Sequence, residues 1–215
     1  MRRRYRLIAF DMDGTLVQHP SSWERLHEHF GTVEVGARNW ELYVRGEIDY
    51  EEFMRRDIAA WGRVSMELVR RVLLGYRLAD GAEELARFLG RAGLVRVIVT
   101  AGIDIVAEDV CRRLGFDEYV ANGLEVDSEG KLTGRGILRV EPFRKEEALK
   151  PILRRRGVSW DEVIAVGDDF HDASLFRAAG LSIGIEGERL GDVRVDYRVE
   201  GLRELIPLLR DVIGL

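Results

Sequence analysis

Two aspartates, two positions apart, end the first apolar run of the chain. The stretch "LIAFDMDGTLV" (7–17) places Asp11 and Asp13 directly after residues fit for burial. Two negative charges this close destabilise a fold unless a cation binds between them or a reaction uses them. A carboxylate can accept a phosphoryl group, and a second one can move a proton. The pair therefore favours phosphoryl-transfer chemistry with a bound cation.

Similar polar groups follow later apolar runs. "VIVTAG" and "VIAVGDDFHD" each end an apolar run with side chains that can bind a phosphate or a metal, and a lysine begins a helical segment before the second run. The threonine hydroxyl, the turn amides and the lysine ammonium would neutralise negative charge on a transferring phosphoryl group. Carboxylates from two strands are suitable ligands for Mg²⁺. The complete set is Asp11, Asp13, Thr100, Gly102, Lys145, Asp168, Asp169 and Asp172.

The elements that must position this set alternate between strand and helix. Strand-length runs rich in Val and Ile occupy 7–10, 94–99, 163–166 and 181–185, and helix-period segments occupy 82–91, 106–114, 146–156 and 173–179. Continuous apolar strands are buried on both faces, as in a parallel sheet, and ligands bind at the carboxyl ends of such strands. We therefore predict a doubly wound, Rossmann-like α/β core. The glycine after each helix is expected to adopt the left-handed conformation: Gly93, Gly115, Gly157 and Gly180.

Two segments do not follow this alternation of strands and helices. From Trp23 to about Leu78 only helical periodicity is found, which predicts a small helical cap inserted after the first strand. "LEVDSEGKLTG" (124–134) alternates and bends at 128–130, which predicts a β-hairpin. The expected division is a core of residues 1–17 and 79–215 and a cap of residues 18–78.

The polar set resembles the motifs of the haloacid dehalogenase superfamily, in its phosphoserine phosphatase-like branch. "DMDGTL" matches the first motif, Thr100 the second, Lys145 the third, and "GDDFHDASLF" the fourth, in which Asp169 and His171 replace the usual glycine and asparagine. The four motifs occur in order and the resemblance extends over most of the chain.

The resemblance implies a role for each matching residue. Asp11 would be the nucleophile and a Mg²⁺ ligand, and Asp13 would be the general acid and base, with its backbone carbonyl on the metal. Thr100, the amide of Gly102 and Lys145 would bind the phosphoryl oxygens. Asp168 would ligate Mg²⁺. Three residues would support the metal's surroundings: Asp169, His171 and Asp172.

The resemblance weakens where substrate is selected. Phosphoserine phosphatases hold the substrate's amino group with a glutamate after the first motif and its carboxylate with a cap arginine. Pro20 and Asp57 stand at the aligned positions here. Glu24, Arg55 and Arg56 are neighbouring candidates for these tasks, and Asp57 is a fourth candidate for substrate specificity.

Composition bounds the remaining possibilities. A net charge of −5, with charges of both signs interspersed, gives no reason to expect nucleic acid or a membrane as partner. A single cysteine, Cys111, excludes an internal disulfide and fits a cytoplasmic location. The cap histidines His19, His27 and His29 have no spacing typical of zinc, so packing or surface roles are expected. The cap tryptophans fall on helical stripes, which predicts packing: Trp23, Trp40 and Trp61.

The resulting hypothesis is a Mg²⁺-dependent phosphatase that acts on a small phosphorylated metabolite through an aspartyl-phosphate. Two alternatives stay open: a phosphotransferase or phosphomutase of the same fold, and a catalytically idle binding module. The chain is expected to be a monomer or a homodimer, and its sequence does not distinguish the two.

Overall fold

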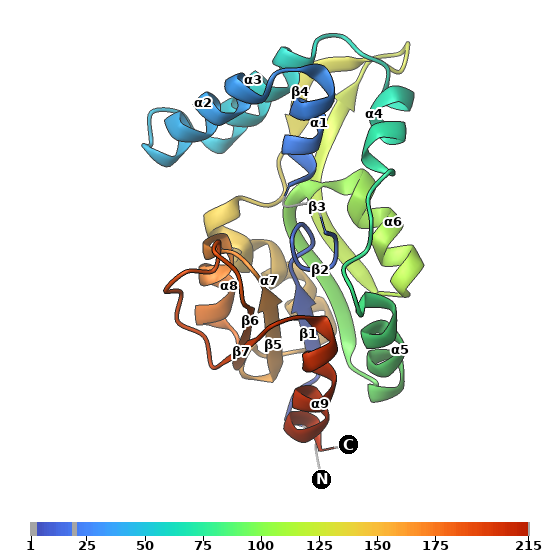
Figure 1. The fold of residues 1–215 in the computed structure, drawn as a ribbon, viewed down its shortest axis with the longest axis vertical. Helices are drawn as coiled ribbons and strands as arrows, with labels where there is room; N and C mark the ends of the chain where they lie inside the picture. The colour runs from blue at the N-terminus through green and yellow to red at the C-terminus, as the bar shows by residue number, and fades with distance from the viewer. Residues whose placement is uncertain (1–3, 19–20, 215) are drawn as a thin grey trace.

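A seven-stranded sheet forms the centre of the molecule, and helices cover both of its faces (Figure 1). The computed structural model describes residues 4–18 and 21–214. The strand order is β4-β3-β2-β1-β5-β6-β7. All neighbouring strands are parallel except β3 and β4, which form an antiparallel pair. The strands are β1 (Leu7–Phe10), β2 (Val95–Ile103), β3 (Glu118–Val126), β4 (Leu132–Ile137), β5 (Val163–Gly167), β6 (Leu181–Ile185) and β7 (Tyr197–Val199).

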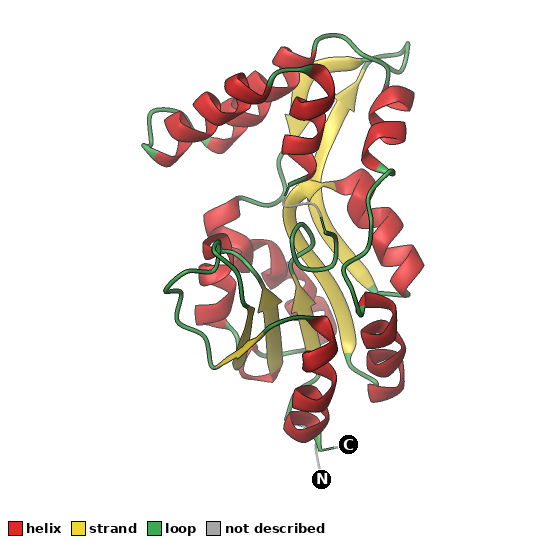
Figure 2. Cartoon of the chain, viewed as in Figure 1, coloured by secondary structure: helices red, strands yellow, loops and turns green. Residues whose placement is uncertain are grey.

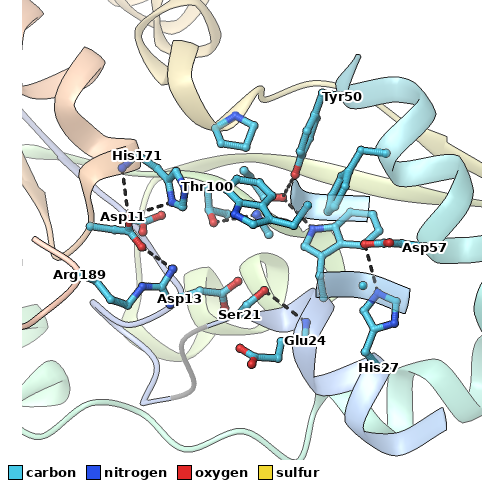
Figure 3. Close-up of a pocket in the computed structure, with 18 of the residues that line it drawn as sticks. Asp11, Asp13, Ser21, Glu24, His27, Tyr50, Asp57, Thr100, His171 and Arg189 are labelled. Atoms are coloured by element: carbon cyan, nitrogen blue, oxygen red, sulfur yellow. Dashed lines mark hydrogen bonds and ion pairs between the residues drawn. The ribbon is translucent and has the colours of Figure 1, made fainter. Parts of the chain in front are cut away.

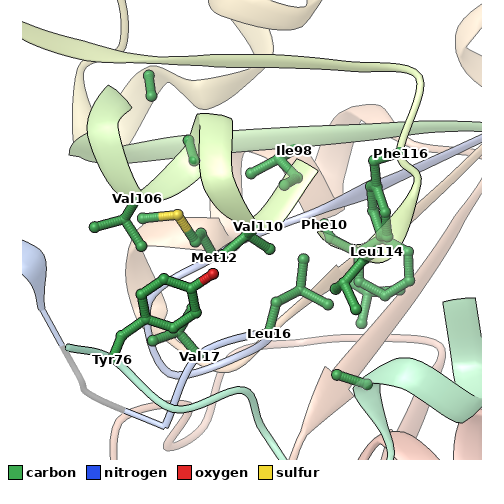
Figure 4. Packing of buried hydrophobic residues seen from close by; sticks show 14 of the residues in the cluster. Phe10, Met12, Leu16, Val17, Tyr76, Ile98, Val106, Val110, Leu114 and Phe116 are labelled. Carbon is green, nitrogen blue, oxygen red and sulfur yellow. The ribbon is translucent and has the colours of Figure 1, made fainter. Parts of the chain in front are cut away.

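The central strand β1 is buried on both faces because its residues alternate between two hydrophobic clusters. Ile8 and Phe10 belong to the cluster beneath α5 (Ala82–Ala92), α6 (Asp104–Leu114) and α9 (Leu202–Ile213). Leu7 and Ala9 belong to the cluster beneath α7 (Lys145–Arg156) and α8 (Ala173–Ala178). Figure 4 shows the first cluster continuing past the strand through Met12 and Leu16. The predicted doubly wound α/β core is confirmed.

Four helices follow β1, as the periodicity predicted: α1 (Ser22–Phe30), α2 (Val33–Val44), α3 (Tyr50–Trp61) and α4 (Met66–Leu73). Side chains of Ser21, Asp49 and Ser65 accept hydrogen bonds from backbone amides in the first turns of α1, α3 and α4, which fixes where these helices begin. Figure 2 shows the four helices gathered at one end of the sheet. A division of the chain at residues 17/18 and 78/79 stays a prediction.

The hairpin is longer than its sequence pattern suggested. β3 begins at Glu118, pairs in parallel with β2 as far as Asn122, and then forms the antiparallel pairing with β4 from Gly123 onward. β4 packs on α3, so the hairpin joins the four helices. β7 was not predicted from the sequence, because its three residues include two that are exposed at the sheet edge.

One of the four predicted helix stops is wrong. Gly93, Gly115 and Gly157 are left-handed, with φ of 67°, 65° and 59°. Gly180 is not among the residues with positive φ; α8 ends through Ala179 in extended conformation. A Cβ at Gly180 would lie 2.2 Å from the backbone oxygen of Asp161, so close backbone approach explains this glycine.

Candidate active site

The acidic residues predicted at the strand ends converge at one edge of the sheet. Oxygen atoms of Asp11, Asp168 and Asp172 lie within 4.8 Å of one another, and we call these three residues the aspartate cluster. Asp11 follows β1 and is 4% exposed, whereas Asp172 follows β5 at the end of a short 3-10 turn and is 0% exposed. The neighbouring parallel strands β1 and β5 bring these carboxylates together.

Lys145, the first residue of α7, supplies positive charge to the cluster. Its Nζ lies 2.9 Å from Asp11 Oδ1 and donates a hydrogen bond of 2.6 Å to Asp172 Oδ1. Burial alone would lower the pKa of Lys145, but the two carboxylates raise it, so the side chain is an ammonium. One ammonium does not balance three carboxylates. Burial and the charge of Asp11 accordingly raise the pKa of Asp168 to about 7 and that of Asp172 to about 8.

This charge imbalance fits a divalent cation. The three carboxylates, of which Asp11 lines the cavity, offer the hard oxygen ligands that Mg²⁺ prefers, and a bound cation would remove the repulsion that raises these pKa values. The cluster includes Asp172, which was expected only to support the metal's surroundings, and not the side chain of Asp13.

Gly14 makes the close approach of Asp168 possible. Its φ is +86°, and a Cβ at this position would lie 2.2 Å from Asp168 Oδ2. Thr15, the next residue, donates a hydrogen bond of 2.5 Å from Oγ1 to Asp168 Oδ1. The Gly-Thr pair of the first motif therefore holds the carboxylate of the fourth.

Asp13 points away from the cluster and toward α1. Its Oδ2 accepts hydrogen bonds from the Ser22 amide (2.9 Å) and the Ser22 hydroxyl (2.8 Å). The same hydroxyl accepts a hydrogen bond from the Ile103 amide, which ties the start of α1 to the end of β2. Asp13 is half-buried and lines the pocket, a position suited to exchanging a proton with a substrate.

Thr100 and Gly102 lie within β2, which extends three residues beyond Thr100 in place of ending there. The pairing of β2 with β3 is irregular between Val99 and Ile103, and this irregular segment faces the pocket. Thr100 is 1% exposed, and its hydroxyl accepts a hydrogen bond of 3.0 Å from the Gly102 amide.

The carbonyl of Ala101, between these two residues, accepts three hydrogen bonds. The donors are Trp23 Nε1 from α1 (3.0 Å), the Tyr50 hydroxyl from α3 (3.4 Å) and Asn122 Nδ2 from β3 (2.9 Å). Asn122 also donates to the Val140 carbonyl and accepts from two backbone amides, so its amide group is fully used.

The fourth motif differs from the expected pattern at two positions, and both side chains have partners. Asp169 caps the short 3-10 turn by accepting from the His171 amide, and it pairs with Arg189. His171 Nδ1 lies 2.9 Å from Asp169 Oδ1, and its ring meets Trp40 of α2 edge-on at 5.1 Å. Asp169 is 2% exposed, and its carboxylate is outside the aspartate cluster.

A cavity of about 330 Å³ joins these residues to the helices of the insertion (Figure 3). Among the four specificity candidates, Glu24 and Asp57 line this cavity. Arg55 and Arg56 do not; both pair with Glu52 on the outer face of α3. His19 and Pro20 lie outside the described residues. Trp23 and Trp40 line the cavity, while Trp61 packs behind it on Trp23.

Several residues of the site were not predicted from the sequence, among them Asn39, Asn122, Ser22, Tyr50 and Arg189. The two asparagines carried a signal, because they are the only two in the chain and both are buried, Asn39 at 5% and Asn122 at 0%. A buried amide must be hydrogen-bonded, so its position marks a polar network. Ser22 and Arg189 carried no comparable signal, since serine and arginine are ordinary at exposed positions.

Comparison with known proteins decides the family. The haloacid dehalogenase-like hydrolase model matches residues 8–177. The chain belongs to this family. The phosphoserine phosphatase of Methanocaldococcus jannaschii is 30% identical over 214 residues, which cover 98% of this chain and 100% of that protein. The phosphoserine phosphatase of Archaeoglobus fulgidus is 31% identical over 189 residues, which cover 87% of this chain and 54% of that protein.

Solved structures agree with the sequence relatives. A phosphoserine phosphatase carrying a phospho-aspartyl intermediate analogue superimposes with a TM-score of 0.82 at 28% identity, over 96% of this chain and 99% of that one. A substrate-bound phosphoserine phosphatase gives the same values. The predicted resemblance to the phosphoserine phosphatase-like branch is confirmed, and the chain is an enzyme of the phosphatase class.

None of the helices described is long and apolar enough to cross a membrane.

Proposed function

We propose that this enzyme is a Mg²⁺-dependent phosphomonoesterase that hydrolyses a small phosphorylated metabolite through an aspartyl-phosphate on Asp11. The observation that carries the proposal is the aspartate cluster with Lys145 at the carboxyl ends of β1 and β5, where Asp11 and Lys145 line the cavity. Asp11, Asp168 and Asp172 would hold the cation. Bound Mg²⁺ would neutralise charge on the phosphoryl oxygens.

In the first half-reaction, a carboxylate oxygen of Asp11 attacks phosphorus and the ester P–O bond breaks. Asp13 gives a proton to the leaving alcohol oxygen. Thr100, the Gly102 amide and Lys145 donate hydrogen bonds to the phosphoryl oxygens, where negative charge develops. Ser22 supports this step because its two hydrogen bonds hold the Asp13 carboxylate beside the cavity.

In the second half-reaction, water replaces the alcohol. Asp13 takes a proton from that water, whose oxygen attacks phosphorus, and the bond between phosphorus and Asp11 breaks. Inorganic phosphate leaves, and both carboxyl groups return to their starting states. Trp40 and His171 line the cavity in edge-on contact, and this contact between α2 and the fourth motif would restrict the access of bulk water.

The test compares Asp11→Asn with the wild-type enzyme on 4-nitrophenyl phosphate in the presence of Mg²⁺. We expect turnover to fall by at least about 10³-fold, because an amide does not attack phosphorus. Asp211→Asn, which changes an exposed aspartate of α9 outside the cavity, is the control and should keep wild-type turnover. Wild-type activity in Asp11→Asn would contradict the mechanism. Product analysis distinguishes hydrolysis from transfer: phosphorylated acceptor in place of free phosphate would favour a phosphotransferase or phosphomutase.

A further inference from the structure

The cavity has a second polar end, formed by a buried carboxylate on α3. Asp57 is 1% exposed and lines the same cavity as Asp11. Figure 3 shows Asp57 and His27 on one side of the cavity, and Asp11 and His171 on the other. If the enzyme is a phosphomonoesterase, as proposed above, a substrate whose phosphate lies at Asp11 extends its alcohol part toward Asp57. The role of Asp57 therefore rests on that proposed activity.

Each carboxylate oxygen of Asp57 contacts a side-chain nitrogen from another helix. Asn39 Nδ2 donates a hydrogen bond of 2.8 Å to Asp57 Oδ1, and His27 Nε2 lies 3.1 Å from Asp57 Oδ2. The indole N–H of Trp61 donates to His27 Nδ1 at 3.2 Å. The Thr32 hydroxyl lies 2.8 Å from the same Nδ1. With Nδ1 accepting from the indole, the ring hydrogen lies on Nε2 and faces Asp57 Oδ2.

Aromatic rings surround the space in front of this carboxylate. Tyr50 and Phe53 precede Asp57 by seven and four positions, so the three side chains share one face of α3. The rings of Trp23 and Trp40 lie 6.2 Å and 5.7 Å from that of Phe53. All four rings line the cavity. The face of an aromatic ring is electronegative and attracts a cation, most strongly where water is excluded.

The positive groups that line the cavity are committed elsewhere. Lys145 contacts Asp11 and Asp172, and Arg189 pairs with Asp169, all at the phosphate end. The described lining residues include one lysine and one arginine, Lys145 and Arg189, and because both pair with aspartates at the phosphate end, neither is placed beside Asp57. A carboxylate in the alcohol part of the substrate would meet a buried like charge, which is unfavourable.

We propose that the substrate is a phosphomonoester whose alcohol part carries an amine or ammonium group and no carboxylate, and that Asp57 recognises this cation. The aromatic rings of α1, α2 and α3 enclose it. Asp57 then determines specificity, whereas the aspartate cluster performs the reaction. The rival explanation gives Asp57 a structural role only, as the link between α3 and Asn39 of α2.

The wild-type enzyme tests the proposal with three esters and Mg²⁺. Ethanolamine phosphate carries the cation, n-propyl phosphate replaces the ammonium by a methyl group of similar size, and phosphoserine adds a carboxylate. We expect kcat/KM for ethanolamine phosphate to exceed the values for both other esters by about tenfold or more. Equal values for the amine and propyl esters, or a preference for phosphoserine, would overturn the proposal and leave phosphatase activity intact.

Two variants separate recognition from structure. In Asp57→Asn the preference for the amine ester over the propyl ester should fall to about twofold or less, chiefly through KM. Glu52→Gln removes one negative charge from the same helix outside the cavity and should keep the wild-type ratio. An unchanged ratio in Asp57→Asn, with all esters slowed alike, would show the structural role and refute recognition. The wild-type comparison decides the question if Asp57→Asn does not fold.

The failure of the two proposals can be told apart. If the wild-type enzyme hydrolyses 4-nitrophenyl phosphate and shows no preference for the cation, only the inference about Asp57 is wrong. If no ester is hydrolysed in the presence of Mg²⁺, including 4-nitrophenyl phosphate, the proposed function is wrong, and the inference that depends on it is overturned as well.

Discussion

Lys145→Met removes the ammonium that lies between Asp11 and Asp172. Lys145 is 3% exposed and Asp172 is 0% exposed, so the two carboxylates would remain buried without that partner. Breaking a buried pair in this way costs about 3–5 kcal/mol. We expect the free energy of unfolding to fall by this amount.

A double-mutant cycle with Asp172→Asn measures the coupling. Lys145→Met/Asp172→Asn removes the charge together with its partner, so we expect it to be about 2 kcal/mol more stable than the sum of the single changes predicts. Urea unfolding followed by circular dichroism, with a chelator present, gives the four stabilities. Added Mg²⁺ should restore part of the stability of Lys145→Met, since a cation replaces the lost charge. Turnover should stay low because the phosphoryl oxygens lose a donor.

Lys150→Met is the matched control on the same helix. Lys150 is 42% exposed in its side chain and pairs with Glu147 one turn away, so its loss should cost less than about 0.5 kcal/mol. A Lys145→Met variant within about 1 kcal/mol of wild type, or an additive cycle, would refute the reasoning that these buried groups are electrostatically coupled.

Three further predictions concern the same site. Gly14→Ala should abolish Mg²⁺-dependent turnover because the added Cβ would collide with Asp168. Gly115→Ala, which also has a positive φ but open space around it, should lose stability only. Activity assays and thermal melting of both variants check this prediction. Ser22→Ala should lower kcat more for an alkyl phosphate than for 4-nitrophenyl phosphate, since it loosens Asp13 and the poorer leaving group depends more on its proton. Stabilisation by Mg²⁺ should grow as the pH rises from about 5 to about 8, because protons compete with the cation below the raised pKa values of Asp168 and Asp172. Thermal melting with Mg²⁺ and with a chelator measures this stabilisation at each pH. A difference in melting temperature between the two conditions that stays constant or falls with pH would contradict the charge imbalance.

The sheet could be predicted from the sequence because its central strands are long apolar runs with glycine-ended helices between them. β7 could not, because its pairing with β6 depends on the backbone and two of its three residues are exposed. The first half of β3 was missed for a related reason: "EYVAN" has no clear alternation, and its parallel partner β2 lies about twenty residues earlier in the chain. Whether such segments form strands depends on pairing with strands that are distant in the sequence.

The polar set at the strand ends was predictable because parallel strands present their carboxyl ends at one edge. The contacts that each of these side chains makes could not be predicted. Sequence spacing placed Arg55, Arg56 and Asp57 together, but the helical period turns the arginines outward to Glu52 and Asp57 inward to Asn39. The contacts of His27 with Trp61 and Asp57 could be found only from the three-dimensional structure.

The crowded carbonyl of Ala101 has a mechanical consequence for the enzyme. A trans peptide unit points its C=O and its N–H in opposite directions. Three donors on α1, α3 and β3 hold the Ala101 carbonyl on the side of the insertion, and they thereby orient the Gly102 amide toward Thr100 and the phosphate end. If the Gly102 amide binds the phosphate as proposed, the helices proposed to enclose the alcohol part of the substrate also orient this donor. A displacement of these helices would then rotate the peptide, so loss of enclosure and loss of phosphate binding would occur together.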